Sequence, residues 1–374
     1  MAKTDDAKVK MFEHSKAKVE LYGNYLSIYL NVLERVPFVT KIFIYDLFGG
    51  EGEYGNGEYG SPIETIRCIK NHYFSNGEKC KDIQILINDS EYSEIELGKL
   101  KIDRIKEISD SIFKPQNVNI IFKKMDYADL LTIVNQEMNS LGNNERALIF
   151  IDPWGYKEIK PNELKALFIN KGVEIILFLP ISFMYRFSEK ALYDDNYPEG
   201  KALESFLREL FSNDIPDITN PHQFIMDLKN RFKTYMTSKY VDSFSIQRDR
   251  TNLYSLFFFI HSKTGFHKMV EAKWRVDKES GKGFRLSKNL SLFSEVELDD
   301  YETKLKHYIF DSNGKTNEEI HDFGYEYGFL PKHSGIVLKK ISNEIELTSL
   351  DGKEVKGYYL SDSNRKILVK KKEI

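Results

Sequence analysis

The chain has 374 residues, of which 41% are hydrophobic and 30% are charged, and its formal net charge is −3. This length suffices for two domains, and the near-neutral charge excludes a basic field over the whole molecule, although not a local basic patch. Two cysteines, Cys68 and Cys80, exclude a disulfide scaffold and a cysteine-rich metal site. The start lacks a secretory signal, and the longest apolar runs are too short to span a bilayer, so we expect a cytoplasmic protein.

The first half of the chain alternates helical and strand patterns. Apolar residues at three- and four-residue steps predict an amphipathic helix over 16–33. Strands are predicted at 41–48, 82–88, 118–124, 147–152 and 173–180, with helices between them at 62–72, 92–108, 129–141 and 161–168. This alternation predicts a parallel sheet.

A polar, aperiodic stretch follows at 182–200, and it predicts a loop or lid inserted after the fifth strand. Beyond it we expect helices at 201–211 and 223–239, a hairpin of strands at 241–247 and 254–261, and a helix at 265–275. A parallel sheet closed by a late hairpin is the layout of Rossmann-like methyltransferases. A dinucleotide oxidoreductase would usually repeat a second α/β half instead.

A polar, glycine-containing stretch at 281–298 predicts a domain boundary, with an α/β domain over 1–285 and a smaller domain over 295–374. The smaller domain carries helical patterns at 301–310, 317–327 and 332–341. A hairpin is predicted from 345–350 and 355–360 with Asp351-Gly352 as its turn, and 366–370 as a further strand. Three short helices and a β-wing indicate a winged-helix-like domain, whose third helix would hold the recognition position.

The first predicted strand carries Asp46 and runs into Phe48-Gly49-Gly50-Glu51-Gly52. Glycines allow a sharp turn and let a ligand lie close to the backbone. Residues 50–55 match a dinucleotide-binding pattern, but Gly57, Gly60, Ser61 and Pro62 continue the loop, so the helix is expected to begin later, with Ser61 as its N-cap.

Polar residues also follow the other parallel strands: Asp89 after the second, Asp126 and Tyr127 after the third, and Asp152-Pro153-Trp154 after the fourth. Parallel sheets bind ligands beyond the carboxyl ends of their strands, so these positions predict one adenosine-bearing site. Each has another interpretation: Asp89 as a helix cap, Asp126 as a turn residue, and Trp154 as packing. An aspartate ending an apolar strand favours function for Asp152.

These motifs resemble the three-Cys-motif partner protein family. The matching segments are 45–52 (Tyr-Asp-Leu-Phe-Gly-Gly-Glu-Gly), Gly60-Ser61-Pro62, 150–155 (Phe-Ile-Asp-Pro-Trp-Gly), and 257–263 with Lys268, Met269 and Trp274. The resemblance spans most of the chain. It implies a methyltransferase-like fold that occurs in bacteria and phages alongside a separate cysteine-rich, radical-type partner protein.

Residues 46–52 also look like motif I of S-adenosylmethionine methyltransferases, and Asp152-Pro153-Trp154 looks like motif IV of the amino-methyltransferases. This resemblance implies that Asp46, Phe48, Gly49, Gly50 and Gly52 bind the cofactor. The strand-end positions add Asp89 for ribose hydroxyls and Asp126 and Tyr127 for an adenine. The resemblance further implies that Asp152 and the Pro153 carbonyl grip an amine and that Trp154 stacks on a base. The family usually has a second proline where Trp154 stands, and Tyr156 is the other candidate ring.

The sequence therefore predicts an S-adenosylmethionine-dependent methyltransferase that acts on nucleic acid, DNA or RNA. The alternative is a catalytically silent scaffold that binds nucleic acid and recruits a partner. In the smaller domain, Lys339, Lys340 and Lys356 are candidate phosphate contacts, against the alternative of a solvated face.

Overall fold

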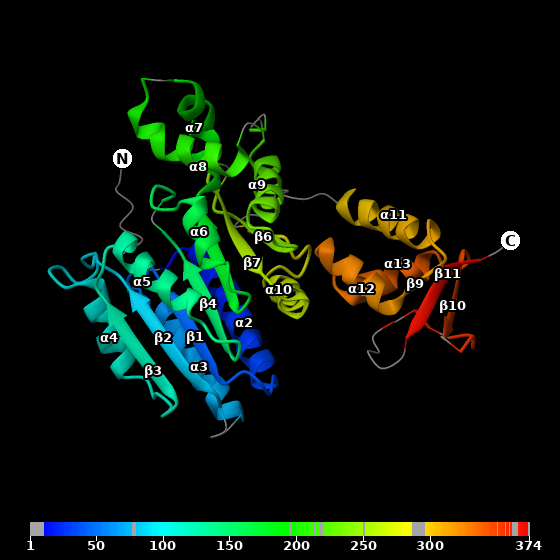
Figure 1. The fold of residues 1–374 in the computed structure, drawn as a ribbon, viewed down its shortest axis with the longest axis horizontal. Helices are drawn as coiled ribbons and strands as arrows, with labels where there is room; N and C mark the ends of the chain where they lie inside the picture. Colours follow the sequence, from blue (N-terminus) through cyan, green and yellow to red (C-terminus); the bar gives the residue numbers. More distant parts are fainter. Residues whose placement is uncertain are drawn as a thin grey trace. The chain divides into compact units, whose positions relative to one another are not determined.

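An eight-stranded sheet forms the centre of the larger unit, with the strand order β3-β2-β1-β4-β5-β7-β6-β8 (Figure 1). Strands β1 to β5 pair in parallel, and β7 runs antiparallel between β5 and β6. The strands are β1 (Lys41–Asp46), β2 (Asp82–Asn88), β3 (Val118–Lys123), β4 (Glu145–Ile151), β5 (Val173–Leu179), β6 (Tyr240–Gln247), β7 (Leu253–Ile260) and β8 (Gly283–Arg285). The expected parallel sheet closed by a late hairpin is confirmed, and β8, which pairs with β6, is an addition to it.

The computed structural model describes residues 11–76, 80–153, 155–194, 196–212, 214–216, 220–249, 251–285, 296–349, 351–355, 357–358, 360 and 366–372. The helices of the larger unit are α2 (Glu13–Glu34), α3 (Ser61–Asn76), α4 (Lys101–Asp110), α5 (Tyr127–Asn139), α6 (Pro161–Leu167), α7 (Ile181–Tyr193), α8 (Lys201–Phe211) and α9 (Pro221–Tyr235). Helix α3 lies between α2 and α4, and α5 neighbours α6, which neighbours α8 (Figure 1). In the described part of the chain, no helix has the length and apolarity to span a bilayer.

Burial on both faces explains why the central strands are so apolar. Every residue of β5 is buried, including Glu174, and β4 is buried from Ala147 to Ile151. Helix α2 adds buried aromatic side chains, with Tyr22 and Tyr25 almost wholly enclosed. Its position is fixed by specific contacts: the Tyr22 ring stacks on Phe150, with centroids 4.5 Å apart. The Tyr22 hydroxyl and the Thr65 hydroxyl lie 2.7 Å apart.

Two segments differ from the expected structure. The stretch 182–200, predicted as a loop or lid, is mostly helical: it forms α7 and a short 3-10 turn, Pro198–Gly200. Its buried positions Ile181, Met184 and Leu192 follow a helical spacing that the surrounding polar residues obscured. The helix predicted over 92–108 begins only at Lys101. Residues 92–100 form a loop closed by a bridge between Tyr92 and Leu100.

The second compact unit comprises Met269–Lys282 and Ser291–Ile374. Its boundary differs from the predicted 285/295, because most of α10 (Lys263–Val276) belongs to it. The reason is Trp274, whose indole N–H donates to the Gly328 carbonyl at 2.8 Å and whose ring lies 4.1 Å from that of His333.

The remaining elements of this unit are α11 (Val296–Phe310), β9 (Lys315–Thr316), α12 (Asn317–Glu326), α13 (Pro331–Lys340), β10 (Ile345–Ser349) and β11 (Ile367–Lys371). They form three helices and an antiparallel sheet in the order β10-β11-β9. The described residues of 355–360 do not form the predicted strand. Strand β10 pairs instead with β11. The expected short turn is present, marked by a bridge from Thr348 to Glu354 and by hydrogen bonds from the Ser349 and Val355 N–H groups to the carbonyls of Lys353 and Leu347.

One side chain joins the ends of β1, β2 and β3 in the larger unit. The Asn88 amide donates to the carbonyls of Leu47 and Met125, at 3.3 and 3.1 Å, and accepts from the Met125 N–H at 2.9 Å. Asn88 is 3% exposed, so water could not readily replace it as the hydrogen-bond partner of these backbone groups. It sets where the three chain segments leave the sheet.

Replacing Asn88 with alanine is expected to lower the free energy of unfolding by about 3 kcal/mol, because buried backbone groups lose their partner. Asn119→Ala is the matched control, since Asn119 lies exposed on β3 and should cost under about 0.5 kcal/mol. Urea unfolding of both variants measures the difference. Equal losses in the two variants would contradict the role given to Asn88.

Candidate functional site

The glycine loop leaves β1 and is pressed against α4. A Cβ on Gly49 would lie 2.9 Å from Ile105, and one on Gly52 would lie 2.7 Å from it. Gly52 also has a φ of +74°, a backbone angle that residues with a side chain rarely adopt. Gly50 differs: its φ is +62°, but a Cβ there would meet nothing within 4 Å. The loop is therefore packed on one side and open at Gly50.

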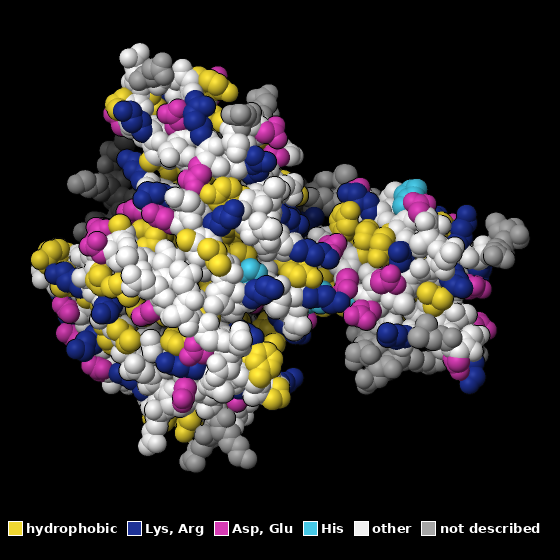
Figure 2. All heavy atoms as spheres, viewed as in Figure 1, with side chains coloured by type: hydrophobic (Ala, Val, Ile, Leu, Met, Phe, Trp, Pro, Cys, Tyr) yellow, Lys and Arg dark blue, Asp and Glu magenta, His cyan; other side chains and the backbone are white. Residues whose placement is uncertain are grey.

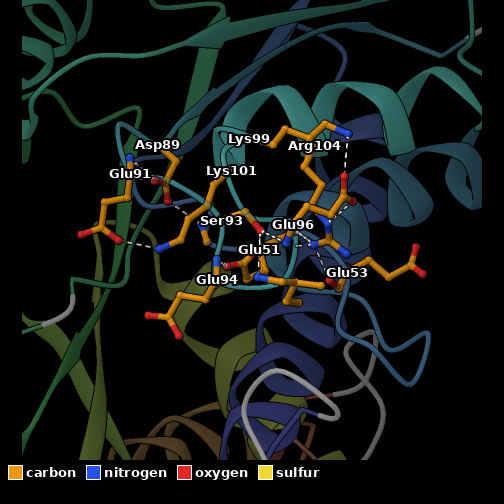
Figure 3. Close-up of polar contacts among 12 residues, drawn as sticks. Glu51, Glu53, Asp89, Glu91, Ser93, Glu94, Glu96, Lys99, Lys101 and Arg104 are labelled. Atoms are coloured by element: carbon orange, nitrogen blue, oxygen red, sulfur yellow. Dashed lines mark hydrogen bonds and ion pairs between the residues drawn. The ribbon is translucent and has the colours of Figure 1, made fainter. Parts of the chain in front are cut away.

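Arg104, from α4, fixes the outer part of this loop (Figure 3). Its guanidinium donates to the backbone carbonyls of Glu51 and Glu53, the latter at 2.6 Å. It also donates to the Glu96 carboxylate at 2.8 Å. The sequence placed Arg104 in a helix without giving it a role. Only the fold, which puts α4 beside the loop, identifies it as the residue that holds the loop.

Glu51 links the glycine loop to the loop after β2. Its carboxylate accepts from the Ser93 hydroxyl and from the Glu94 backbone N–H, each at 2.7 Å (Figure 3). The Glu51 carboxylate is also 3.5 Å from Arg104. Together these bonds make the two loops one polar assembly, which limits how far either can move.

Asp89, predicted to bind cofactor, supports the glycine loop directly. One carboxylate oxygen accepts from the Gly50 N–H at 2.8 Å, and the other accepts from the Glu91 N–H at 2.9 Å. Burial raises the pKa of Asp89, while these N–H groups and the nearby Lys101 ammonium partly oppose the rise. Lys101 itself is 1% exposed and pairs with Glu91. Asp89 thus orients Gly50 from the end of β2.

Asp46, at the end of β1, is fully buried. Among the described residues, neither of its carboxylate oxygens has a hydrogen-bond partner. Burial raises the pKa of Asp46 to about 8, and the nearby carboxylate of Asp152 adds to the rise. The Ser61 hydroxyl and the Phe48 amide lie close enough to offset part of it, without completing bonds of good geometry. A buried carboxyl without a partner is costly.

Asp152, at the end of β4, forms an ion pair with Lys18 of α2. The Lys18 and Asp152 side chains are only 13% and 19% exposed, so this pair is partly shielded from water. The Lys18 ammonium also lies 4.5 Å from the centre of the Phe178 ring. Sequence reasoning missed Lys18, because nothing in a solitary lysine on an amphipathic helix indicates its partner. Pro153 is buried, and Trp154 lies outside the described residues.

The other predicted residues have simpler surroundings. Asp126 is exposed and caps α5 by accepting from the Ala128 N–H at 3.2 Å. Tyr127 is buried, and its ring stacks on Phe48 with centroids 4.9 Å apart. Burial raises the pKa of the Tyr127 hydroxyl. The structure thus brings Phe48 and Tyr127 together beside the glycine loop, whereas the Asp126 carboxylate serves its own helix.

The predicted phosphate contacts lie in the second unit. Lys339 and Lys340 are exposed in the last turn of α13. Lys340 forms an ion pair with Glu302, which partly neutralises its charge. Lys356 lies outside the described residues.

No protein-family model matches the chain, and a search of curated proteins finds no relative. Among solved structures, a Legionella pneumophila protein of the family DUF519 is 13% identical, with 72% of this chain and 93% of that chain covered and a TM-score of 0.41. A loganic acid methyltransferase with SAH is 9% identical, with 71% and 99% covered and a TM-score of 0.26. At such scores these alignments carry no argument, and the fold assignment depends on the strand order.

The contrast between the two glycines can be measured. Gly52→Ala is expected to lower the free energy of unfolding by roughly 2–5 kcal/mol, because strain and a clash with Ile105 add together. Gly50→Ala should cost only roughly 1–2 kcal/mol, from backbone strain alone. Denaturant unfolding compares the two variants, and a Gly50→Ala variant as unstable as Gly52→Ala would show that the space at Gly50 is filled.

Asp46 should make stability depend on pH. Its folded pKa of about 8 lies above its ordinary value of 3.8. The stability it contributes is therefore complete below pH 3.8 and is lost as the pH rises through 8. Relative to wild type, Asp46→Asn should gain stability by up to ~1.4 kcal/mol per pH unit between pH 5 and 8. Urea unfolding at several pH values tests this, and a gap that stays constant would refute the raised pKa.

Proposed function

We propose that this protein binds S-adenosylmethionine beyond the carboxyl ends of β1, β2 and β4 and methylates an amine of a nucleic acid. The observation that carries the proposal is Asp46, a fully buried carboxyl with no hydrogen-bond partner among the described residues. It lies at the end of β1, beside a glycine loop that is open at Gly50. A cationic ligand would supply the missing partner for Asp46.

The neighbouring residues fit the other parts of such a cofactor. The open space at Gly50 leaves room for a ligand against the backbone. Asp89 uses one lone pair of each oxygen for an N–H group and keeps others for the hydroxyls of a ribose. The stacked rings of Phe48 and Tyr127 offer an aromatic edge to an adenine.

When bound, S-adenosylmethionine supplies an electrophilic methyl group. Asp152 would then accept a hydrogen bond from the acceptor amine, with the Pro153 carbonyl as a second acceptor. Asp152 must first leave Lys18, and a ligand carboxylate would compete with Asp152 for that ammonium. Tyr156, the other candidate ring, is buried, and its ring centre lies 5.5 Å from that of Phe183 on α7.

The nucleic-acid part of the proposal draws on the second unit. Its element order, helix–strand–helix–helix–strand–strand, suits a winged helix with α13 in the recognition position. Lys339 is exposed there and suits a phosphate contact. Figure 2 shows positive and negative side chains interspersed over the visible face of the larger unit, so binding would depend on local contacts rather than on a broad basic surface.

A cysteine-rich, radical-type partner belongs to the same proposal. It follows from the resemblance to the three-Cys-motif partner family at 45–52, 60–62 and 150–155. No family model matches the chain, so the resemblance rests on these segments and on 257–263 with Lys268, Met269 and Trp274.

A second candidate function is a methyltransferase-like scaffold without catalysis. One observation favours it: the Lys18 ammonium already occupies the carboxylate of Asp152. In a scaffold, this ion pair would be a permanent part of the packing between α2 and β4. The two candidates differ in whether the folded chain binds the cofactor.

Calorimetric titration with S-adenosylmethionine and S-adenosylhomocysteine tests the proposal. We expect micromolar binding to wild type and a loss of at least about 100-fold in Gly50→Val, because the valine fills the open space. A cation beside Asp46 lowers its pKa, so binding of S-adenosylmethionine should also release a proton near neutral pH.

Gly57→Val is the matched control for this titration. Gly57 has a φ of +77° and open space, like Gly50, but it lies in the exposed outer part of the loop. Binding that survives in Gly57→Val and vanishes in Gly50→Val supports the cofactor site. Absence of binding by folded wild-type protein would overturn the enzyme and favour the scaffold.

A further inference from the structure

Three side chains with different metal-binding atoms meet at the amino-terminal edge of the sheet, away from the strand ends discussed above. Glu34 is the last residue of α2, His72 lies in the final turns of α3, and Cys80 precedes β2. One ligand atom from each, a carboxylate oxygen, an imidazole nitrogen and the thiol sulfur, lie within 4.8 Å of one another.

The surroundings of this cluster favour a cation. Helices α2 and α3 both end here, and the carbonyl ends of helices carry partial negative charge. Among the described residues, no lysine or arginine side chain pairs with the Glu34 carboxylate. The nearby Lys81 ammonium donates instead to the carbonyls of Val36 and Val39. The Glu34 carboxylate contacts His72 and the Lys81 backbone N–H, and the Lys81 ammonium acts on it through its charge without a direct bond.

We propose that Glu34, His72 and Cys80 form a binding site for a divalent transition metal, with Zn²⁺ as the best match. Zn²⁺ takes sulfur, nitrogen and oxygen ligands in tetrahedral geometry, with bonds of about 2.0–2.3 Å. Such bonds place ligand atoms about 3.3–3.7 Å apart, so small side-chain rotations complete the site from the present separations. Three protein ligands leave the fourth position for water.

Binding requires two proton adjustments. Cys80 must lose its thiol proton to solvent, because the thiolate is the ligand. His72 must offer Nε2, which now lies 3.3 Å from Glu34, and carry its proton on Nδ1. The Asn76 amide is 3.1 Å from His72 Nδ1. Turned by 180°, it would present its oxygen to that proton, the outer contact that metal-bound histidines usually have, and would give up the bond that its nitrogen now donates to the His72 carbonyl at 2.9 Å.

The simpler interpretation is a hydrogen-bonded pair of His72 and Glu34 to which the Cys80 thiol does not contribute. His72 is 3% exposed at its side chain, so a buried histidine would need the Glu34 partner in any case. The two interpretations differ in the role of Cys80. A hydrogen-bonded pair has no need of the thiol, whereas a metal site loses a ligand without it.

Cobalt titration of the chelator-treated full-length chain separates them, because a thiolate ligand gives Co²⁺ a near-ultraviolet charge-transfer band. We expect one Co²⁺ per chain with this band, and displacement of Co²⁺ by Zn²⁺. Cys80→Ser should lose the band, and both Cys80→Ser and His72→Gln should bind at least about 100-fold more weakly.

Cys68→Ser is the matched control. Cys68 is also a thiol outside any disulfide, but it is buried in α3 beside the Gly23 carbonyl and does not belong to the cluster. It should keep the band and the affinity. The proposal is overturned if folded wild type shows no band, if Cys80→Ser keeps it, or if His72→Gln binds as wild type does. None of these outcomes depends on S-adenosylmethionine binding.

Discussion

The site depends above all on how the ends of β1, β2 and β3 are joined. Asn88 bonds the segments that follow β1 and β3, and the next residue, Asp89, bonds Gly50. Two consecutive side chains at the end of one strand thus fix where the glycine loop begins and which way Gly50 faces. Arg104 fixes the same loop from its outer side through backbone carbonyls. The opening at Gly50 is therefore preorganised, which lowers the conformational cost of binding a ligand there.

Because the hydrogen bonds of Asn88, Asp89 and Arg104 hold this region so firmly, the carboxyl of Asp46, unpartnered in the part of the chain that the structure describes, stands out as a candidate functional group. Residues in a frame this well bonded usually have their polar atoms satisfied, yet the Asp46 carboxyl is buried without a partner among the described residues. The neighbouring Asp152 has Lys18, whereas Asp46 has only nearby dipoles to offset its burial. Stability given up at one point of a rigid frame is typical of a functional site, because a ligand can recover it on binding.

Much of the fold could be predicted from the sequence because its central strands are buried on both faces and read as apolar runs, as β4 and β5 do. The segment 182–200 could not, since polar residues interrupt the helical spacing of α7. For the site, glycines and strand-end aspartates carry local signals. Lys18 and Arg104 do not, because their roles come from partners 134 and 51 to 53 residues away in the chain.

Helix α2 connects the two edges of the sheet. Lys18, near its start, pairs with Asp152 at the carboxyl ends of the strands, and Glu34, its last residue, lies at the amino ends. Sixteen residues of helix span about 24 Å. Between these points the helix is held by the stacking of Tyr22 on Phe150 and by buried hydrogen bonds of Tyr22 with Thr65 and of Tyr25 with Glu174. A metal held by Glu34 would add a further anchor at the far end of α2, opposite the ion pair of Lys18 with Asp152.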